Sequence, residues 1–248
     1  MDAEKNVKIE FFTNSEPLLA STDIHPKPSK SYIPQWFKDI PSHASLNNNF
    51  EDTVYPSVRS IKTCPAIPDF FSQGYIVPMW ADTTLKYVKE DDTWWYRCGI
   101  MESNSYKIEP HGNQQYLDHA PANFLGNAAD FVFKFVCPWQ LRTPPGYSVF
   151  QIPLFYHFID DFSVMPGVID TDIWHDIHQQ VVYHGKGKEI FIPRGTPLVQ
   201  YIPFKREKQD LSVNFYTEEF KLAVDKNLLL KESMFEGPYK HLKRERDR

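Results

Sequence analysis

The sequence predicts a mainly β protein, a β-sandwich or β-clip-like barrel with a short N-terminal helical insertion and a C-terminal helix. The 248 residues include 20 prolines, and proline scattered through a chain favours short strands and extended loops over long helices. Hydrophobic residues make up 42% of the chain and aromatic residues 15%, which is enough for a sizeable core. Between residues 144 and 204, strand-like runs alternate with turn sequences, as expected of antiparallel β structure.

The stretch from residue 144 to residue 204 gives the clearest strand pattern. Residues 147–155 and 198–204 are apolar on both faces, which is typical of buried strands. Residues 170–184 alternate polar and more apolar side chains. This alternation predicts one half-buried strand, because successive strand residues point to opposite faces. Two turn sequences rich in glycine or proline flank a short strand at residues 189–192: Gly185–Lys188 and Pro193–Pro197.

We expect one apolar core, formed by these strands together with a strong strand at residues 131–137. Full burial of a large apolar side chain contributes about 1.5–3 kcal/mol. Replacing one member by a charged residue should therefore prevent folding. The expected members are Phe133, Phe135, Phe150, Ile152, Ile190, Ile192, Leu198 and Ile202.

The remaining elements are shorter or less regular. The sequence predicts a helical turn at residues 33–41, a short helix at 66–73 and a helix at 217–231. Gly74 is expected in the left-handed conformation that ends a helix, and Thr217 is expected to cap the C-terminal helix. Further strands are expected at residues 7–12, 75–79, 83–88, 93–100 and 211–216, with an acidic hairpin tip at 90–92.

Two segments have no regular pattern of strands or helices. Residues 102–126 lack periodicity and are expected to form a long loop. Residues 239–248 are basic and are expected to be a frayed tail. We predict a single mostly-β domain at residues 1–216, followed by a C-terminal helix and basic tail at residues 217–248.

Charge and cysteine usage exclude several classes of protein. The net charge is −5, which gives no electrostatic reason to expect a nucleic-acid partner. Cys64, Cys98 and Cys137 lie far apart and form no metal-type pair, so we expect reduced, buried thiols in a cytoplasmic setting. The first residues contain no long apolar run, so neither a signal peptide nor a membrane span is expected.

Several short motifs resemble those of a known family. They are PPGY at residues 144–147, GVIDTD at 167–172 and FIPRGTPLVQ at 191–200, with CPA at 64–66 and GYIVP at 74–78 upstream. Together they resemble an uncharacterised family of proteins found in bacteriophages, notably marine and cyanobacterial phages, and in some bacteria. This resemblance implies a phage-type origin, located in the host cytoplasm or the virion, and it implies no particular activity.

The order PPGY, GVID, PRGTPLVQ is also similar to the β-clip fold of dUTP pyrophosphatases and dCTP deaminases. In the pyrophosphatases the aspartate of the Gly-Val-Ile-Asp turn positions the attacking water, and Asp170 takes its place here. The phosphate-binding motif of those enzymes is missing, since residues 153–161 contain neither Lys nor Arg. Phosphates need cationic or backbone donors. Arg194 could supply a charge only if the turn at residues 193–197 folds back toward Asp170.

Two further groups of residues suggest binding chemistry. Asp170, Asp172 and Asp176 share the polar face of the predicted strand with Trp174 and His178. Such a face fits a shallow carbohydrate or cation site with Trp174 as a stacking platform, or simply a solvated outer face. His175, His178 and His184 suggest a cupin-like metal site. On a straight strand, however, His175 and His178 point to opposite faces, and His178 lies roughly 20 Å from His184. We therefore expect no metal and no cofactor.

These observations leave three functional hypotheses. The first is a phage-encoded, non-catalytic binding or structural protein that self-associates or binds a virion or host protein. The second is an enzyme with a modified β-clip site at Asp170. The third is a cupin-like metal-dependent enzyme that uses His175, His178 and His184. In the first two, Asp172, Trp174, Asp176, His178 and Arg194 are the candidate ligand-binding residues.

Overall fold

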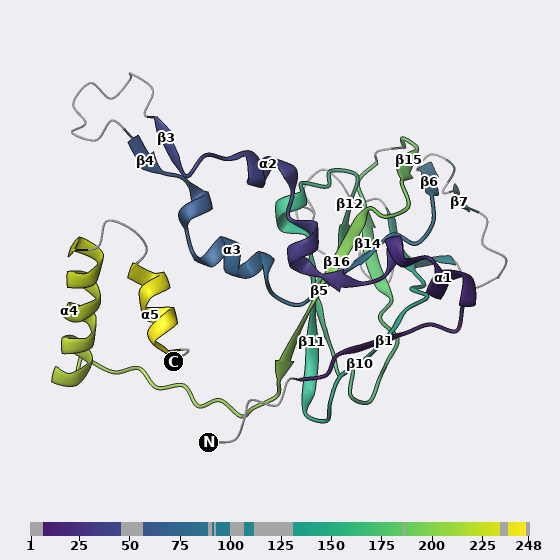
Figure 1. Cartoon of the computed structure of the whole chain (residues 1–248). Coiled ribbons are helices and arrows are strands. Elements are labelled where there is room, and N and C mark those ends of the chain that lie inside the picture. The colour runs from purple at the N-terminus through teal and green to yellow at the C-terminus, as the bar shows by residue number, and fades with distance from the viewer. Residues whose placement is uncertain are drawn as a thin grey trace. The chain divides into compact units, whose positions relative to one another are not determined.

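The computed structural model describes residues 7–45, 57–88, 91, 93–99, 107–111, 131–185, 187–233 and 238–246 (Figure 1). The chain forms two compact units, one of residues Met1–Lys38 with Phe71–Arg206, the other of residues Asp39–Phe70 with Glu207–Arg248. The prediction of a mainly β protein with few helices is confirmed, and the described strands close no barrel. The domain boundary at residue 217 stays a prediction.

Antiparallel sheets build the first unit. The largest has the order β13 (Gly167–Ile169), β11 (Tyr147–Pro153), β16 (Pro197–Lys205), β5 (Tyr75–Pro78), β2 (Lys27–Pro28). A second has the order β12 (Phe162–Val164), β14 (Gln179–Tyr183), β9 (Phe131–Phe135), β8 (Ile108–His111). A third has the order β15 (Ile190–Ile192), β6 (Thr83–Val88), β7 (Thr93–Cys98), and β1 (Glu10–Phe12) pairs with β10 (Gln140–Arg142). In the second unit β3 (His43–Ser45) pairs with β4 (Ser57–Arg59).

Short helices precede and interrupt the strands. The expected N-terminal helical insertion is present as several one-turn pieces, and the Ser15 hydroxyl caps the first of them by accepting from the Leu18 N–H at 3.3 Å. The pieces are α1 (Glu16–Ala20), η1 (Thr22–Ile24), η2 (Ser29–Tyr32), α2 (Gln35–Asp39), η3 (Ile61–Thr63) and α3 (Ala66–Phe71). A separate helical turn, η5 (Phe155–His157), follows β11. The C-terminal helices are α4 (Glu218–Ser233) and α5 (Pro238–Arg246).

A buried polar group lies within the core between the two larger sheets. Tyr201 of β16 is fully buried, and its hydroxyl lies 3.0 Å from Gln151 Oε1 and 2.9 Å from the Ile177 carbonyl oxygen. Gln179 Nε2 of β14 donates to the same hydroxyl at 2.8 Å, which joins the sheets. Burial raises the pKa of Tyr201, so the hydroxyl stays protonated and able to donate.

The core prediction is partly confirmed. Phe133, Phe135, Ile190, Ile192 and Leu198 are buried in one cluster. The prediction is wrong for Phe150, which is 44% exposed, and for Ile152 and Ile202, which are half-buried. Gln151 and Tyr201 point inward, and since successive strand residues point to opposite faces, their neighbours in sequence must point outward.

The predicted strand at residues 170–184 is wrong in its first half. The chain leaves β13 after Ile169 and turns, because the Asp170 carbonyl accepts from the N–H groups of Ile173 (3.0 Å) and Trp174 (2.9 Å). Regular pairing resumes only in β14, from Gln179 to Tyr183. The alternation before residue 179 therefore does not sort these side chains onto two faces of a sheet.

Most local predictions are confirmed, with four exceptions. Gly74 has φ +64° after α3, β6 and β7 form the expected hairpin, and the Thr217 hydroxyl accepts from the Phe220 N–H at 3.1 Å. The expected loop at 102–126 contains β8, and residues 211–216 pair with no strand among the residues that the structure describes. The expected frayed tail is instead helical from Pro238, a residue that suits the first position of a helix. Cys137 is buried as expected, but Cys64 is exposed between η3 and α3. Glu90, Asp92 and residues 112–130 lie outside the described residues.

Within the part of the chain that the structure describes, no helix is long and apolar enough to cross a membrane.

Candidate functional site

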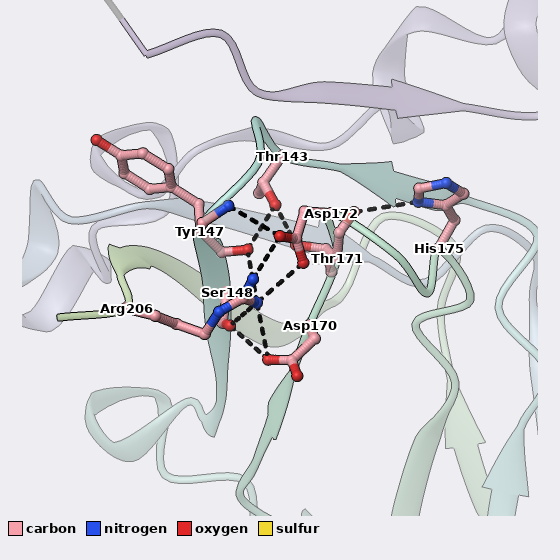
Figure 2. Close-up of polar contacts among 9 residues, drawn as sticks. Thr143, Tyr147, Ser148, Asp170, Thr171, Asp172, His175 and Arg206 are labelled. Atoms are coloured by element: carbon pink, nitrogen blue, oxygen red, sulfur yellow. Dashed lines mark hydrogen bonds and ion pairs between the residues drawn. The ribbon is translucent and has the colours of Figure 1, made fainter. Parts of the chain in front are cut away.

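The turn that follows β13 carries Asp170, the residue expected to be catalytic. It packs against the start of β11 and the end of β16, two strands that pair with each other from Tyr147–Lys205 onward. Figure 2 shows the polar side chains that meet at this place. We call them the Arg206 cluster: Thr143, Ser148, Asp170, Thr171, Asp172 and Arg206.

Arg206 is the centre of the cluster. Its guanidinium forms a two-pronged ion pair with Asp172, with Nη1 donating to Oδ1 at 2.9 Å and Nη2 to Oδ2. Nη1 also lies 3.1 Å from Asp170 Oδ1 and 2.9 Å from Ser148 Oγ. The backbone adds two bonds at the same place, from Arg206 N–H to the Gly146 carbonyl (2.8 Å) and from Gly146 N–H to Asp172 Oδ2 (2.9 Å).

Buried hydroxyl groups extend the hydrogen-bond network of the cluster. Ser148 Oγ donates to Asp170 Oδ1 at 2.5 Å, and Ser148 itself is fully buried. The hydroxyls of Thr143 and Thr171 lie 2.8 Å apart, and Thr143 Oγ1 also donates to the Tyr147 carbonyl at 3.0 Å. Hydrogen bonds thus join three chain segments that lie far apart in sequence.

The two carboxylates differ in exposure. The Asp172 side chain is 6% exposed, whereas that of Asp170 is 50% exposed. Hydrogen bonds from Arg206 and from the Gly146 N–H lower the pKa of Asp172 to about 2. Two carboxylates and one guanidinium give the cluster a net charge of −1, so it does not attract a phosphate. The positive guanidinium lies between the carboxylates and would repel a cation bound there.

The Asp172–Arg206 pair predicts a specific pH dependence of stability. Since the folded pKa lies below the ordinary value of 3.8, the stabilisation is complete above about pH 4 and is lost as the pH falls toward 2. In Asp172→Asn we expect the melting temperature to fall less steeply than in the wild type between pH 4 and pH 2. Thermal melts at half-unit pH intervals measure the two slopes.

Arg206→Met is the matched variant for this experiment, because it removes the other half of the same pair. It should flatten the profile in the same pH range. An Asp172→Asn profile parallel to that of the wild type would contradict a structural role for the pair.

The other predicted ligand-binding residues are not gathered at the cluster. Asp176 accepts from Gln140 Nε2 at 3.1 Å, and Trp174 is 63% exposed. Arg194 forms its own two-pronged pair with Asp23, at 2.8 and 3.0 Å, and its N–H donates to Asp82. The possibility that Arg194 supplies a charge to Asp170 therefore finds no support in these contacts.

The three histidines of the metal hypothesis bind three different partners. His175 Nδ1 lies 3.1 Å from the Thr171 carbonyl, His178 Nδ1 accepts from the Cys137 N–H at 3.2 Å, and His184 Nε2 lies 2.8 Å from Ser163 Oγ. Burial lowers the pKa of His178 and of His184, so both rings are neutral near pH 7. Among the residues described, no group of three His, Cys, Asp or Glu side chains is arranged to hold a metal ion.

Arg206, the residue that organises the cluster, is not among the site residues that the sequence predicts. Arg206 follows the closing strand and lies 34 positions from Asp172, so no local motif links the two. Ser148 and Thr143 belong to the PPGY region, but their hydroxyl contacts depend on the pairing of β11 with β13. These groups come together because β11 pairs with β13 on one side and with β16 on the other.

Comparisons with known proteins show little similarity. No protein-family model matches the chain, and no curated protein sequence matches it. Among solved structures, the native dUTPase of EIAV is similar at a TM-score of 0.30 and 11% sequence identity, over 58% of this chain and 87% of that chain.

Proposed function

We propose that the chain is a non-catalytic binding or structural protein of phage-type origin that acts through an exposed apolar surface. The observation that carries this proposal is the outer face of the five-stranded sheet. Phe150 stacks on Phe204, with ring centroids 4.3 Å apart and planes at 25°. Val168, opposite Phe150 in β13, is 56% exposed, and Ile202 lies opposite Phe150 in β16.

An ordered apolar surface of this kind favours a binding role. Apolar side chains from three neighbouring strands lie side by side, whereas single exposed apolar residues are common and need no explanation. These strands are fixed by the core on their other face, so the surface is preformed. Binding to a preformed surface costs less conformational entropy than ordering a loop.

The contacts of Asp170 favour a structural role over catalysis. One of its oxygens is bound by both Ser148 and Arg206, and the single guanidinium of the cluster is already paired with carboxylates. A triphosphate needs cationic clamping that supplies much of the stabilisation of the transition state. The cluster offers no uncommitted positive charge for it.

The phage-type origin rests on the motifs PPGY, GVIDTD and FIPRGTPLVQ. The first two include the strand start at Tyr147 and the turn at Asp170, which meet at the Arg206 cluster, and the third contains the start of β16, the strand whose other end leads to Arg206. Under this proposal the motifs preserve the architecture of the site, and the partner is a virion protein, a host protein or a second copy of the chain.

The second candidate, a modified β-clip enzyme, is favoured by the half-exposed carboxylate of Asp170. A turnover assay decides between the two. We expect no release of pyrophosphate or phosphate above background from a panel of deoxynucleoside triphosphates with magnesium, for the wild type and for Asp170→Asn alike. Inorganic pyrophosphatase is added to convert any pyrophosphate to phosphate, which is then detected colorimetrically at micromolar protein.

The Asp170→Asn variant distinguishes turnover at Asp170 from turnover by a contaminating enzyme. Release at roughly 1 per second or faster that disappears in Asp170→Asn would overturn the proposal. Slow release of equal size in both proteins would come from a contaminating phosphatase and would agree with it.

A further inference from the structure

Residues 211–215 have the side-chain pattern of a strand but belong to no sheet within the described part of the chain. They lie in the extended run between β16 and α4 (Figure 1). Leu211, Val213 and Phe215 are 92%, 91% and 95% exposed. Ser212 and Asn214 share the opposite face, since Asn214 Nδ2 donates to Ser212 Oγ at 3.0 Å. The segment therefore has one apolar and one polar face, as a half-buried strand has.

We propose that residues 211–215 of two copies of this chain pair as antiparallel strands about a two-fold axis at Val213. In this register Leu211 lies opposite Phe215 of the second copy, Ser212 lies opposite Asn214, and Val213 lies opposite its own equivalent. Every apolar side chain faces an apolar one and every polar side chain a polar one. Cross-strand pairs of this kind are what stabilises antiparallel sheets.

The sequence itself favours a second copy as the occupant. The pattern apolar-polar-apolar-polar-apolar reads the same in both directions, so one copy presents what the other requires. The five residues carry no charge and do not repel one another. A register shifted by one residue would place apolar side chains on the polar face of the partner strand.

Charge at the two ends of the segment favours the antiparallel direction. Because Arg206 is already paired with Asp170 and Asp172, residues 205–210 contribute two further basic and two acidic side chains, whereas residues 216–221 contain two acidic and one basic. Antiparallel pairing brings the net negative end of one copy to the neutral end of the other. Parallel pairing would bring the two net negative ends together.

The segment is tethered at its C-terminal end, which lowers the entropy lost on pairing. Tyr216 packs edge-on against Phe220 of α4, with ring centroids 5.2 Å apart, and Thr217 caps the same helix. A two-fold contact uses the same surface on both copies and closes after two chains. The dimer would then present two outer sheet faces to a further partner, so this inference goes beyond the proposed function and concerns a different surface.

Cysteine cross-linking tests the register directly. Val213→Cys, in a Cys64→Ser background because Cys64 is exposed, places two thiols directly opposite each other. Opposed residues of an antiparallel pair have Cβ atoms about 4.5–5.5 Å apart, and a disulfide needs about 3.5–4.5 Å. We expect most of this variant to form a covalent dimer under mild oxidation.

Leu211→Cys is the matched control in the same background. Its own equivalent in the second copy lies four residues further along the strand, roughly 13 Å away, so it should cross-link poorly alone. Mixed with Phe215→Cys, it should form a mixed disulfide. Equal cross-linking of Val213→Cys and Leu211→Cys, or none in either, would overturn the register.

Sedimentation of the full chain without added cysteines tests the dimer itself. We expect the wild type to have the mass of two chains at micromolar concentration. Val213→Asp, which opposes two carboxylates on the axis, should have the mass of one chain, and Ser212→Asp should remain a dimer. Because Val213 is almost fully exposed in one copy, Val213→Asp should melt as a folded protein.

Val168→Asp separates this inference from the proposed function. Val168 lies on the outer face of the five-stranded sheet, so this substitution should leave the dimer formed through residues 211–215 intact. A dimer lost in Val168→Asp but kept in Val213→Asp would refute pairing through residues 211–215 while supporting the sheet face as a binding surface. A monomeric wild type would refute this inference alone.

Discussion

Gly74→Ala is expected to destabilise the protein by on the order of 3 kcal/mol. Gly74 has φ +64°, a conformation that side chains with a Cβ rarely adopt. A Cβ here would lie 2.0 Å from the Tyr201 carbonyl oxygen and 2.9 Å from Ile202 Cα, and both are backbone atoms of the central strand β16. Relief would require β5 to separate from β16. Urea denaturation measures the free energy of unfolding.

Gly167→Ala is the control for this substitution. Gly167 lies in the edge strand β13, and an added Cβ there meets nothing within 4 Å. The change should alter the free energy of unfolding by no more than about 0.5 kcal/mol. If Gly74→Ala changed the free energy of unfolding as little as Gly167→Ala, the close approach of Gly74 to the backbone of β16 would be contradicted.

Phe135→Ala is expected to cost about 3–5 kcal/mol. Phe135 is fully buried in β9 and meets three aromatic rings: Phe133 at 5.0 Å, Trp80 at 6.1 Å and Phe162 at 6.3 Å between centroids. Truncation loses the transfer free energy of the ring and leaves a cavity that surrounding aromatic rings cannot readily fill. Thermal and urea unfolding should both shift strongly.

Phe155→Ala makes the same chemical change at a position that is 70% exposed. It should cost about 0.5 kcal/mol or less, because most of the ring already faces water. A small effect of Phe135→Ala, comparable to that of Phe155→Ala, would remove β9 from the core.

The features that the sequence predicted correctly depend on local chemistry. Gly74 follows a short helix, Thr217 precedes one, and turn residues separate β6 from β7; each signal acts over a few residues. The strand predicted at residues 170–184 failed because hydrogen bonds from Ile173 and Trp174 to Asp170 bend the chain. The alternation of polar and apolar residues does not reveal this turn, because the side chains of the turn bind a segment that lies far away in the sequence.

The candidate site was predictable only in part. Asp170 and Asp172 lie in a recognisable turn, so the sequence points to their position along the chain. Their partner Arg206 lies just beyond β16, and its role depends on the pairing of Tyr147 with Lys205. Long-range strand pairing of this kind leaves no local pattern in the sequence, so the sequence alone predicts Asp170 and Asp172 as site residues without revealing their partner.

The buried hydroxyl of Tyr201 also determines which side of the largest sheet becomes the interior. β11 and β16 carry apolar residues on both faces, so hydrophobicity alone would allow either face to turn inward. Gln151 lies directly opposite Tyr201, and both side chains form hydrogen bonds on the inner side of the sheet, with groups of Ile177, Gln179 and Met165. Turning the sheet over would expose these groups and bury the Phe150–Phe204 stack at little hydrophobic cost. The polar trio of Gln151, Gln179 and Tyr201 thus gives the fold a single orientation and keeps an apolar surface available on the outside.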